Sequence, residues 1–294
     1  MFANYRGVAA RLAVGVSGRL RPQQSSMLEV EFNQRSDSGR VRENNEDYLG
    51  HALPSSAEEA RTHGWLFALA DGVGGQERGE VASRSAVEGL LAEFRSAPPG
   101  EAPVPLLTRL VQAANARVYK LGLETGRGDR TMATTLVACA LRYDRAVVAH
   151  VGDSRCYLFR SGRAALLTRD HTVAGEHERL GLLSLEEAAK ATTRHLLTRS
   201  LGNDLFVGVE TSEHQILSGD VLLLCSDGLH GSVTSQEMVH IVGHSLNLAS
   251  AAEKLVTAAN QRDGSDNISV LLIRIRGVER IGMYRGRPYR LANS

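Results

Sequence analysis

The chain has 294 residues, a hydrophobic fraction of 43% and a formal net charge of +1 at pH 7. A chain of this length can bury a substantial core in one domain, and its balanced charge gives no overall field that would attract nucleic acid or an anionic membrane. No apolar run reaches the roughly 18 residues that a membrane-spanning helix requires. We therefore expect a soluble protein with no nucleic-acid partner and no membrane span, and we favour a monomer.

The two ends of the chain differ in composition from its middle. Residues 1–27 contain four arginines and no acid, which predicts a basic, disordered extension, although a transit peptide would have a similar composition. Residues 277–294 are also basic and are expected to form an exposed tail. One folded domain is therefore predicted over residues 28–276.

The predicted elements follow from apolar runs and their spacing. In chain order they are a strand at 65–70, a helix at 80–94, a proline-rich linker at 97–105, a helix at 106–121, strands at 134–141 and 146–151, a helix at 185–190, a strand at 221–225, a helix at 248–261 and a strand at 268–275. Several strands are apolar without alternation, which indicates burial on both faces. The strands do not alternate strictly with helices, so we expect a layered α+β domain.

Three cysteines, Cys139, Cys156 and Cys225, each lie inside an apolar run, and no two of them have metal-ligand spacing. Such thiols are typical of core packing in a reducing compartment. We therefore expect a cytoplasmic protein.

Acidic residues recur where the predicted strands begin or end. The segments are Asp71-Gly72, Gly152-Asp153-Ser154, Ser226-Asp227-Gly228 and Asp266-Asn267. Each alone could be a turn or a cap. Together they would crowd one end of a core, where unpaired charges are costly and a cation or shared protons are needed.

The chemistry of this acidic group favours hard divalent cations. Carboxylate and carbonyl oxygens suit Mg²⁺ or Mn²⁺, and the lack of nearby cysteine or histidine ligands argues against a structural zinc site. Two such ions roughly 3.5–4 Å apart form a known device for hydrolysing phosphate esters.

Six motifs occur in order along the chain. They are Arg42-Glu-Asn-Asn-Glu46-Asp47, Ala70-Asp71-Gly72-Val-Gly-Gly75, Met132-Ala-Thr134-Thr135, Val151-Gly152-Asp153-Ser154-Arg155, Ser226-Asp227-Gly228 and Asp266-Asn267. This set resembles the metal-dependent protein phosphatase family, class 2C, in its compact bacterial form, over about residues 33–276. The resemblance implies a four-layer αββα sandwich, two antiparallel sheets between helical layers, with a metal cleft at one end. It also implies phosphoserine and phosphothreonine proteins as substrates, an opposing bacterial Ser/Thr kinase, and two Mn²⁺ or Mg²⁺ ions.

The resemblance also assigns the metal ligands. Asp71 would bridge two ions, with the Gly72 carbonyl completing one shell, while Asp227 and Asp266 bind the other ion. Asp153 would help Asp227 hold a third, weaker ion.

The remaining assignments concern support and substrate. Asp47 would act mostly through coordinated water, with Glu46 and Asn267 supporting the ligands. Arg42 resembles the family's phosphate clamp, because its planar fork of donors matches two phosphate oxygens. A surface salt bridge is the alternative for Arg42.

The resulting hypothesis is one-step hydrolysis. A metal-bridged hydroxide attacks phosphorus in line, the metals and Arg42 neutralise the phosphoryl oxygens, and no phosphoenzyme forms. Val73 stands where some family members have a proton-donating histidine, so the donor to the leaving group is left open. Residues 167–202 resemble the family's flap, a candidate for substrate selection, in which His171 is expected to be structural.

Three other interpretations are open. Cys139 and Arg145 have the Cys-x5-Arg spacing of a cysteine phosphatase, but no glycine lies between them to shape an anion-binding loop. The glycines of 72–75 lack the spacing of a nucleotide-binding loop. A catalytically inactive phosphatase fold that binds phosphoproteins is the alternative from another functional class, although every matched metal position keeps its acid.

Overall fold

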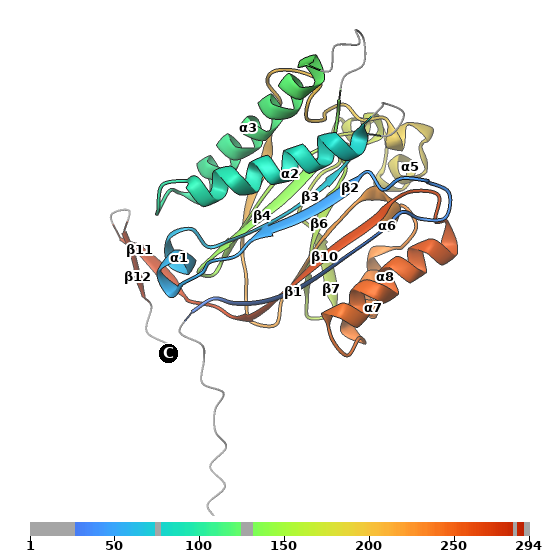
Figure 1. Cartoon of the computed structure of the whole chain (residues 1–294). Coiled ribbons are helices and arrows are strands. Elements are labelled where there is room, and N and C mark those ends of the chain that lie inside the picture. Colours follow the sequence, from blue (N-terminus) through green and yellow to red (C-terminus); the bar gives the residue numbers. More distant parts are fainter. Residues whose placement is uncertain (1–26, 74–77, 125–131, 285–286, 291–294) are drawn as a thin grey trace, which may run out of the picture.

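The computed structural model of the chain describes residues 27–73, 78–124, 132–284 and 287–290. Two antiparallel five-stranded sheets are stacked face to face between helices (Figure 1). The first sheet has the order β1 (Glu29–Asp37), β10 (Ile268–Gly277), β9 (Val221–Cys225), β6 (Arg155–Arg160), β7 (Arg163–Leu166). The second has the order β2 (Asp47–Ala52), β3 (Trp65–Asp71), β4 (Leu136–Arg142), β5 (Arg145–Val151), β8 (Glu210–Gln215). This confirms the predicted α+β sandwich.

Helices cover the outer face of each sheet. The helices α2 (Gly79–Ser96) and α3 (Pro103–Glu124) pack on the second sheet. On the first sheet lie α7 (Ser235–Gly243) and α8 (Leu248–Arg262). Each central strand therefore has an apolar neighbour on both faces, which is why these strands read as continuous apolar runs.

The core between the two sheets shows the two-residue period of a strand. In β3, Phe67 and Leu69 point into this core, while Leu66 and Ala68 pack under α2 and α3. All three cysteines are buried and unpaired, as the sequence predicts, and Cys139 and Cys156 lie in this layer.

Residues 167–202, which the sequence compares with a flap and which are called the flap below, follow β7 in the chain. The flap contains α4 (Val173–Arg179), α5 (Leu185–Lys190) and a 3₁₀ helix, η1 (Thr192–His195). The α5 helix has its predicted bounds because Ser184 and Glu187 cap each other's backbone N–H groups. Two backbone bonds close the base of the flap, from Val173 N to Leu196 O at 2.9 Å and from Thr198 N to His171 O at 2.8 Å.

Several elements differ from the prediction. The helix α3 begins at Pro103, inside the expected linker, because proline is compatible with the first turn of a helix. The edge strands β1, β2, β7 and β8 and the short helices α1 (Ala57–Thr62), α4 and α6 (Asp227–His230) were not predicted, nor were β6 and α7. Edge strands such as β8, with the sequence Glu-Thr-Ser-Glu-His-Gln, carry too few apolar residues to give a signal.

The ends of the chain are described only in part. Residues 1–26 lie outside the described residues. After β10, Val278 packs against the inter-sheet core and Glu279 is 6% exposed, so the start of the predicted tail is folded. A hairpin of β11 (Ile281–Tyr284) and β12 (Arg287–Arg290) follows. Over the described ranges, every helix is too short or too polar to cross a membrane.

Candidate metal centre

The predicted acidic residues come together because their strands end at the same edge of the sandwich. Asp47 begins β2 and lies opposite Asp71, the last residue of β3, in the antiparallel register. Asp227 follows β9 and Asp266 precedes β10, and these two strands are antiparallel neighbours. Asp153 lies in the turn that joins β5 of one sheet to β6 of the other. Each carboxylate therefore comes from a different strand end.

Burial and mutual repulsion make this group unstable as free anions. The pKa of Asp71 is raised well above its usual value, first by burial and then by the negative charges of Asp47 and Asp227. Burial likewise raises the pKa of Asp47 to about 7 and that of Asp153 to about 8. Such a cluster is stabilised by protons or by cations.

Asp47 has one carboxylate oxygen that its protein neighbours leave free. Ser226 Oγ donates to Asp47 Oδ2 at 2.8 Å and accepts from Ser269 N at 3.0 Å. Asp47 Oδ1 is buried, and within the part of the chain that the structure describes it has no hydrogen-bond partner. An orphaned buried oxygen in a set of oxygen donors fits a hard divalent cation or its water ligands.

The segment Asp71-Gly72 is held by its backbone. Thr134 Oγ1 donates to Asp71 O at 2.8 Å, and Thr135 Oγ1 accepts from Asp71 N at 3.0 Å. Gly72 N donates to Glu46 O at 3.1 Å. These bonds explain the two threonines of the third sequence motif, because they orient the end of β3.

Gly72 lies too close to α2 for any larger residue. A Cβ there would lie 2.4 Å from the carbonyl group of Gly79, so Gly72→Ala should push the start of α2 away from β3. We expect a loss of about 1–3 kcal/mol in unfolding free energy, together with reduced activity. Gly243→Ala, where a Cβ would meet no atom within 4 Å, is the control and should change stability by less than about 0.5 kcal/mol. Equal melting temperatures of the two variants would contradict this steric argument.

Asn267 organises the loop that carries Arg42 and Glu46. Its Oδ1 accepts from Glu46 N at 2.8 Å, and its Nδ2 donates to Ser38 O and Asn44 O at 3.1 and 3.0 Å. All of its polar side-chain atoms are therefore used to hold the loop against β10.

Arg42 lies at the exposed rim of the cluster. Its Nη2 is 3.1 Å from Asp266 Oδ2, and the two side chains are 41% and 37% exposed. An exposed pair of this kind adds little stability. The guanidinium is thus held next to the carboxylates and remains accessible to a ligand.

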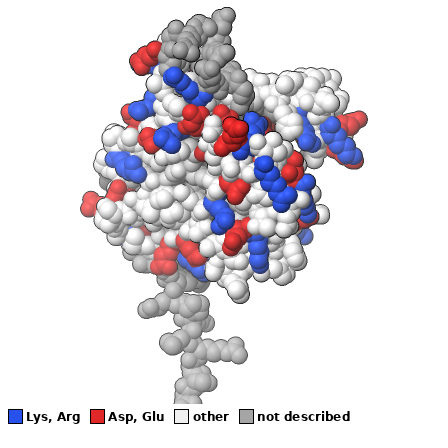
Figure 2. Space-filling model, turned by 45° about the vertical axis from the view of Figure 1, so that its right-hand side comes forward, with Lys and Arg blue, Asp and Glu red and all other residues white. Residues whose placement is uncertain are grey.

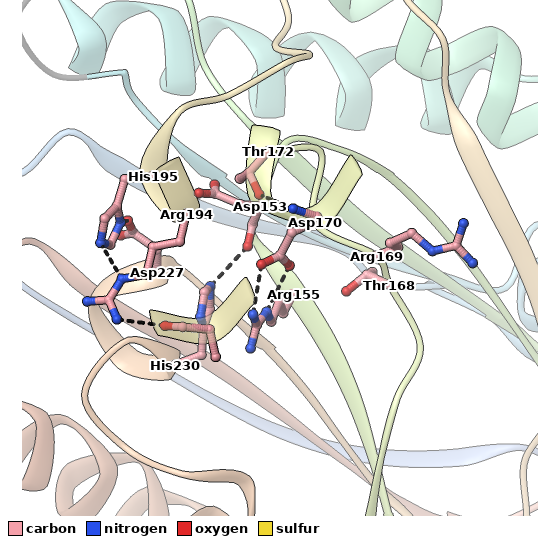
Figure 3. A network of polar contacts seen from close by, with 12 residues as sticks. Asp153, Arg155, Thr168, Arg169, Asp170, Thr172, Arg194, His195, Asp227 and His230 are labelled. Atoms are coloured by element: carbon pink, nitrogen blue, oxygen red, sulfur yellow. Dashed lines mark hydrogen bonds and ion pairs between the residues drawn. The ribbon is translucent and has the colours of Figure 1, made fainter. Parts of the chain in front are cut away.

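A cleft of about 440 Å³ is lined by two of these aspartates and by residues of the flap. Its lining includes Asp153 and Asp227 together with Leu185, Ala188 and Arg194 of the flap. In Figure 3, Asp153 and Asp227 lie beside the flap residues Arg194 and His195.

Basic and acidic side chains are intermixed on the face shown in Figure 2, in agreement with the balanced net charge.

Two histidines contact the aspartates in this cleft. His195 Nδ1 of the flap is 3.7 Å from Asp227 Oδ2, and His230 Nε2 bonds to the backbone oxygen of Asp153 at 3.0 Å (Figure 3). Burial alone would raise the pKa of Asp227, but its bond to His195 and the influence of His230 lower it.

Arg155 and Asp170, which also line this cleft, form a bidentate ion pair. The distances are 2.8 Å from Arg155 Nε to Asp170 Oδ1 and 2.7 Å from Nη2 to Oδ2 (Figure 3). Arg155 Nη1 also donates to Tyr157 Oη at 2.9 Å. This pair fixes the strand β6 immediately after Asp153.

Most of the predicted residues lie at the site, together with three residues that were not predicted. The predicted acids, Arg42 and Asn267 gather at one edge, while Gly74 and Gly75 lie outside the described residues. Ser226, which bonds Asp47, stood next to a predicted ligand in its motif and could have been found there. His195 and His230 gave no signal because only tertiary folding brings them to the aspartates.

The buried cysteines do not suit a nucleophile. Cys139 is 0% exposed in the middle of β4. Burial raises the pKa of Cys225 to about 12. A cysteine phosphatase needs an accessible thiolate of low pKa, so this alternative is not supported.

Two stacked sheets between helices, with clustered carboxylates at one edge and a cleft above them, define a metal-dependent phosphatase fold. The family model described as protein phosphatase 2C matches residues 34–268. The chain belongs to the protein phosphatase 2C family. Members of this family are metal-dependent protein phosphatases, and the relatives support an active enzyme, not an inactive phosphatase fold.

Three similar proteins illustrate this membership. The serine/threonine phosphatase Stp of Listeria welshimeri is 36% identical over 263 residues, which cover 88% of this chain and 99% of that protein. The structure of the Ser-Thr phosphatase MsPP from Mycobacterium smegmatis has a TM-score of 0.71 at 35% identity and covers 85% of this chain and 99% of its own. The PstP catalytic domain, in complex with two manganese ions, has a TM-score of 0.69 at 31% identity, with coverage of 85% and 99%.

Proposed function

We propose that this chain removes phosphate from phosphoserine and phosphothreonine in proteins, opposes a Ser/Thr kinase or acts on that kinase's targets, and uses two Mn²⁺ or Mg²⁺ ions. The observation that supports this most strongly is the group of clustered aspartates with raised pKa values, one of which has an orphaned buried oxygen. The oxygen-only donor set fits such ions.

The proposed ligands are those of the sequence prediction. Asp71, with the Gly72 carbonyl, would help to hold both ions, and Asp227 and Asp266 would be ligands of the second ion. Asp153 would hold a third, weaker ion together with Asp227. When bound, the ions supply an activated water and neutralise charge on the phosphoryl group.

The supporting residues act through hydrogen bonds and through water. Asp47 and Glu46 would orient coordinated water, and Ser226 keeps the carboxylate of Asp47 in one orientation through its 2.8 Å bond. Asn267 fixes the backbone of Glu46.

Arg42 would bind the phosphate at the rim of the site. Its guanidinium can exchange Asp266 for two phosphate oxygens, since the present pair is exposed. The flap residues that line the cleft would contact the protein on either side of the phosphorylated residue.

We expect Arg42→Ala to raise the KM for a phosphothreonine peptide about tenfold or more, which corresponds to the loss of about 1.5–3 kcal/mol in charged hydrogen bonds. Mn²⁺ affinity, measured by calorimetry, should change little. Arg163→Ala, at an exposed arginine on the β6–β7 hairpin, is the matched control and should keep the wild-type KM. An unchanged KM in Arg42→Ala would show that Arg42 forms only a surface ion pair.

The substrate class is tested by comparing phosphopeptides with one sequence. With Mn²⁺ present, the phosphothreonine and phosphoserine peptides should be hydrolysed, and the phosphotyrosine peptide much more slowly. Equal rates on phosphotyrosine, or hydrolysis of a nucleoside triphosphate but of no peptide, would overturn the proposed substrate.

A further inference from the structure

His171, at the base of the flap, binds both polar groups of the Gly152 backbone. Its own N–H donates to Gly152 O at 3.0 Å, and its ring Nδ1 accepts from Gly152 N at 3.1 Å. Gly152 has φ +104° and a Cβ there would lie 2.6 Å from Thr135, so only glycine fits this turn. The next residue is Asp153, one of the clustered carboxylates.

These contacts determine the tautomer of His171. A backbone N–H can only donate, so Nδ1 must present its lone pair and the proton of the neutral ring is on Nε2. Nε2 lies 3.3 Å from Glu210 Oε2 on β8. A carboxylate oxygen accepts a hydrogen bond, so Nε2 is the donor of this contact. His171 is 1% exposed, and burial, followed by the neighbouring His150, lowers its pKa to about 4, so the ring is neutral at working pH.

His150 orients this ring from the other side. The two imidazoles stack with centroids 4.7 Å apart and planes 14° apart, and His150 Nε2 bonds to Arg169 O at 2.8 Å. The ring of His171 is thus fixed by a stacking partner, by a carboxylate and by the Gly152 backbone.

The same residues have the composition of a metal site, but their hydrogen bonds oppose that function. Potential ligand atoms of His150, His171 and Glu210 lie within 4.8 Å of one another. However, the proton on His171 Nε2 removes its lone pair, and Arg199 Nη1 lies 3.4 Å from that nitrogen. A cation would therefore meet an N–H donor and a positive charge. These three residues therefore suit a hydrogen-bond network better than a metal site.

We propose that His171 is a positioning residue that sets the turn at Gly152 and thereby directs the Asp153 carboxylate toward a weakly bound cation. The Gly152 N–H fixes the tautomer of the ring, and Glu210 holds the ring in place through Nε2–H. This inference rests on the proposed role of Asp153 as a metal ligand. On the other side of the turn, His230 holds Asp153 O at 3.0 Å, so the aspartate backbone is fixed from both directions.

His171 also connects this turn to the flap. Its carbonyl oxygen accepts from Thr198 N at 2.8 Å in the bond that closes the flap base. The flap and the metal-binding turn therefore share one residue, and a movement of the flap base would be transmitted to Asp153.

Two substitutions at His171 separate its two ring contacts. In His171→Asn the amide oxygen can replace Nδ1 as acceptor for Gly152, whereas in His171→Gln the longer side chain can reach only toward Glu210. We expect calorimetry to show weak-site Mn²⁺ affinity within about threefold of wild type for His171→Asn and about 10–100-fold lower for His171→Gln. Glu210→Gln, which keeps an acceptor for Nε2–H, should bind as wild type.

Asp153→Asn separates failure of this inference from failure of the proposed ligand set. If Asp153→Asn leaves the weak Mn²⁺ site intact, Asp153 is not a ligand and the inference loses its basis. If Asp153→Asn removes that site while His171→Gln and His171→Asn bind Mn²⁺ equally, the positioning role alone is wrong. Melting temperatures in chelator show which variants fold; should His171→Gln not fold, Glu210→Ala replaces it, and unchanged weak-site affinity there would overturn the proposal.

Discussion

Asp71→Asn is expected to lower turnover of a phosphothreonine peptide by on the order of 10³-fold or more. Asp71 ends β3 opposite Asp47 and interacts electrostatically with the other clustered aspartates, and in the proposed ligand set both ions of the central pair depend on it. Metal ions supply several kcal/mol of transition-state stabilisation, and each 1.36 kcal/mol is a factor of ten in rate. Steady-state kinetics at saturating Mn²⁺ measure this effect. Turnover within a few fold of wild type would show that Asp71 is not a central ligand.

The same variant should be more stable than wild type when metal is absent. The pKa of Asp71 is raised, so the folded state pays for keeping this group among like charges at neutral pH, and the neutral amide removes that repulsion. We expect a higher melting temperature in chelator, by about 2–4 °C for each kcal/mol relieved, and a smaller or reversed difference with Mn²⁺. Asp220→Asn is the matched control, because buried Asp220 is paired with Arg160 at 2.9 and 2.6 Å. It should lose stability in chelator and keep its turnover.

Arg155→Met should have the largest effect on stability outside the metal ligands. It leaves Asp170 without its bidentate partner, close to Asp153, whose pKa the charge of Asp170 helps to raise. We expect a loss of about 2–3 kcal/mol, below the 3–5 kcal/mol of a fully buried pair because the two side chains are 25% and 18% exposed. Chemical denaturation in chelator measures the change.

A second substitution tests the cause. In Arg155→Met with Asp170→Asn no unpaired charge is left, so part of the lost stability should return. If the double variant is less stable than the single one by the full effect of Asp170→Asn, the two residues act independently and the ion-pair explanation is wrong.

Elements with strong local signals could be predicted from the sequence. The strand β9 and the helix α5 have their predicted bounds, because one is a short apolar run and the other has a reciprocal cap. The clustering of Asp71, Asp153 and Asp227 could be predicted because each lies at the end of an apolar strand, and such strand ends meet at one edge of the core.

Other features depend on tertiary contacts and gave no local signal. The polar edge strand β8 is recognisable only by its pairing with β5, although it carries Glu210 to His171. A structural role for His171 could be predicted from the sequence, but its contact with Gly152, 19 positions earlier, could not. Similarly, His195 reaches Asp227 only because the flap folds back over the cleft.

The most direct measurement is hydrolysis of a phosphothreonine peptide by the full chain with Mn²⁺, repeated after chelation and again after Mn²⁺ is restored. The clustered aspartates should make activity depend fully on the ion, so turnover should be lost in chelator and should return when Mn²⁺ is added. Turnover that persists in chelator would contradict a metal-dependent site built on Asp71, Asp227 and Asp266.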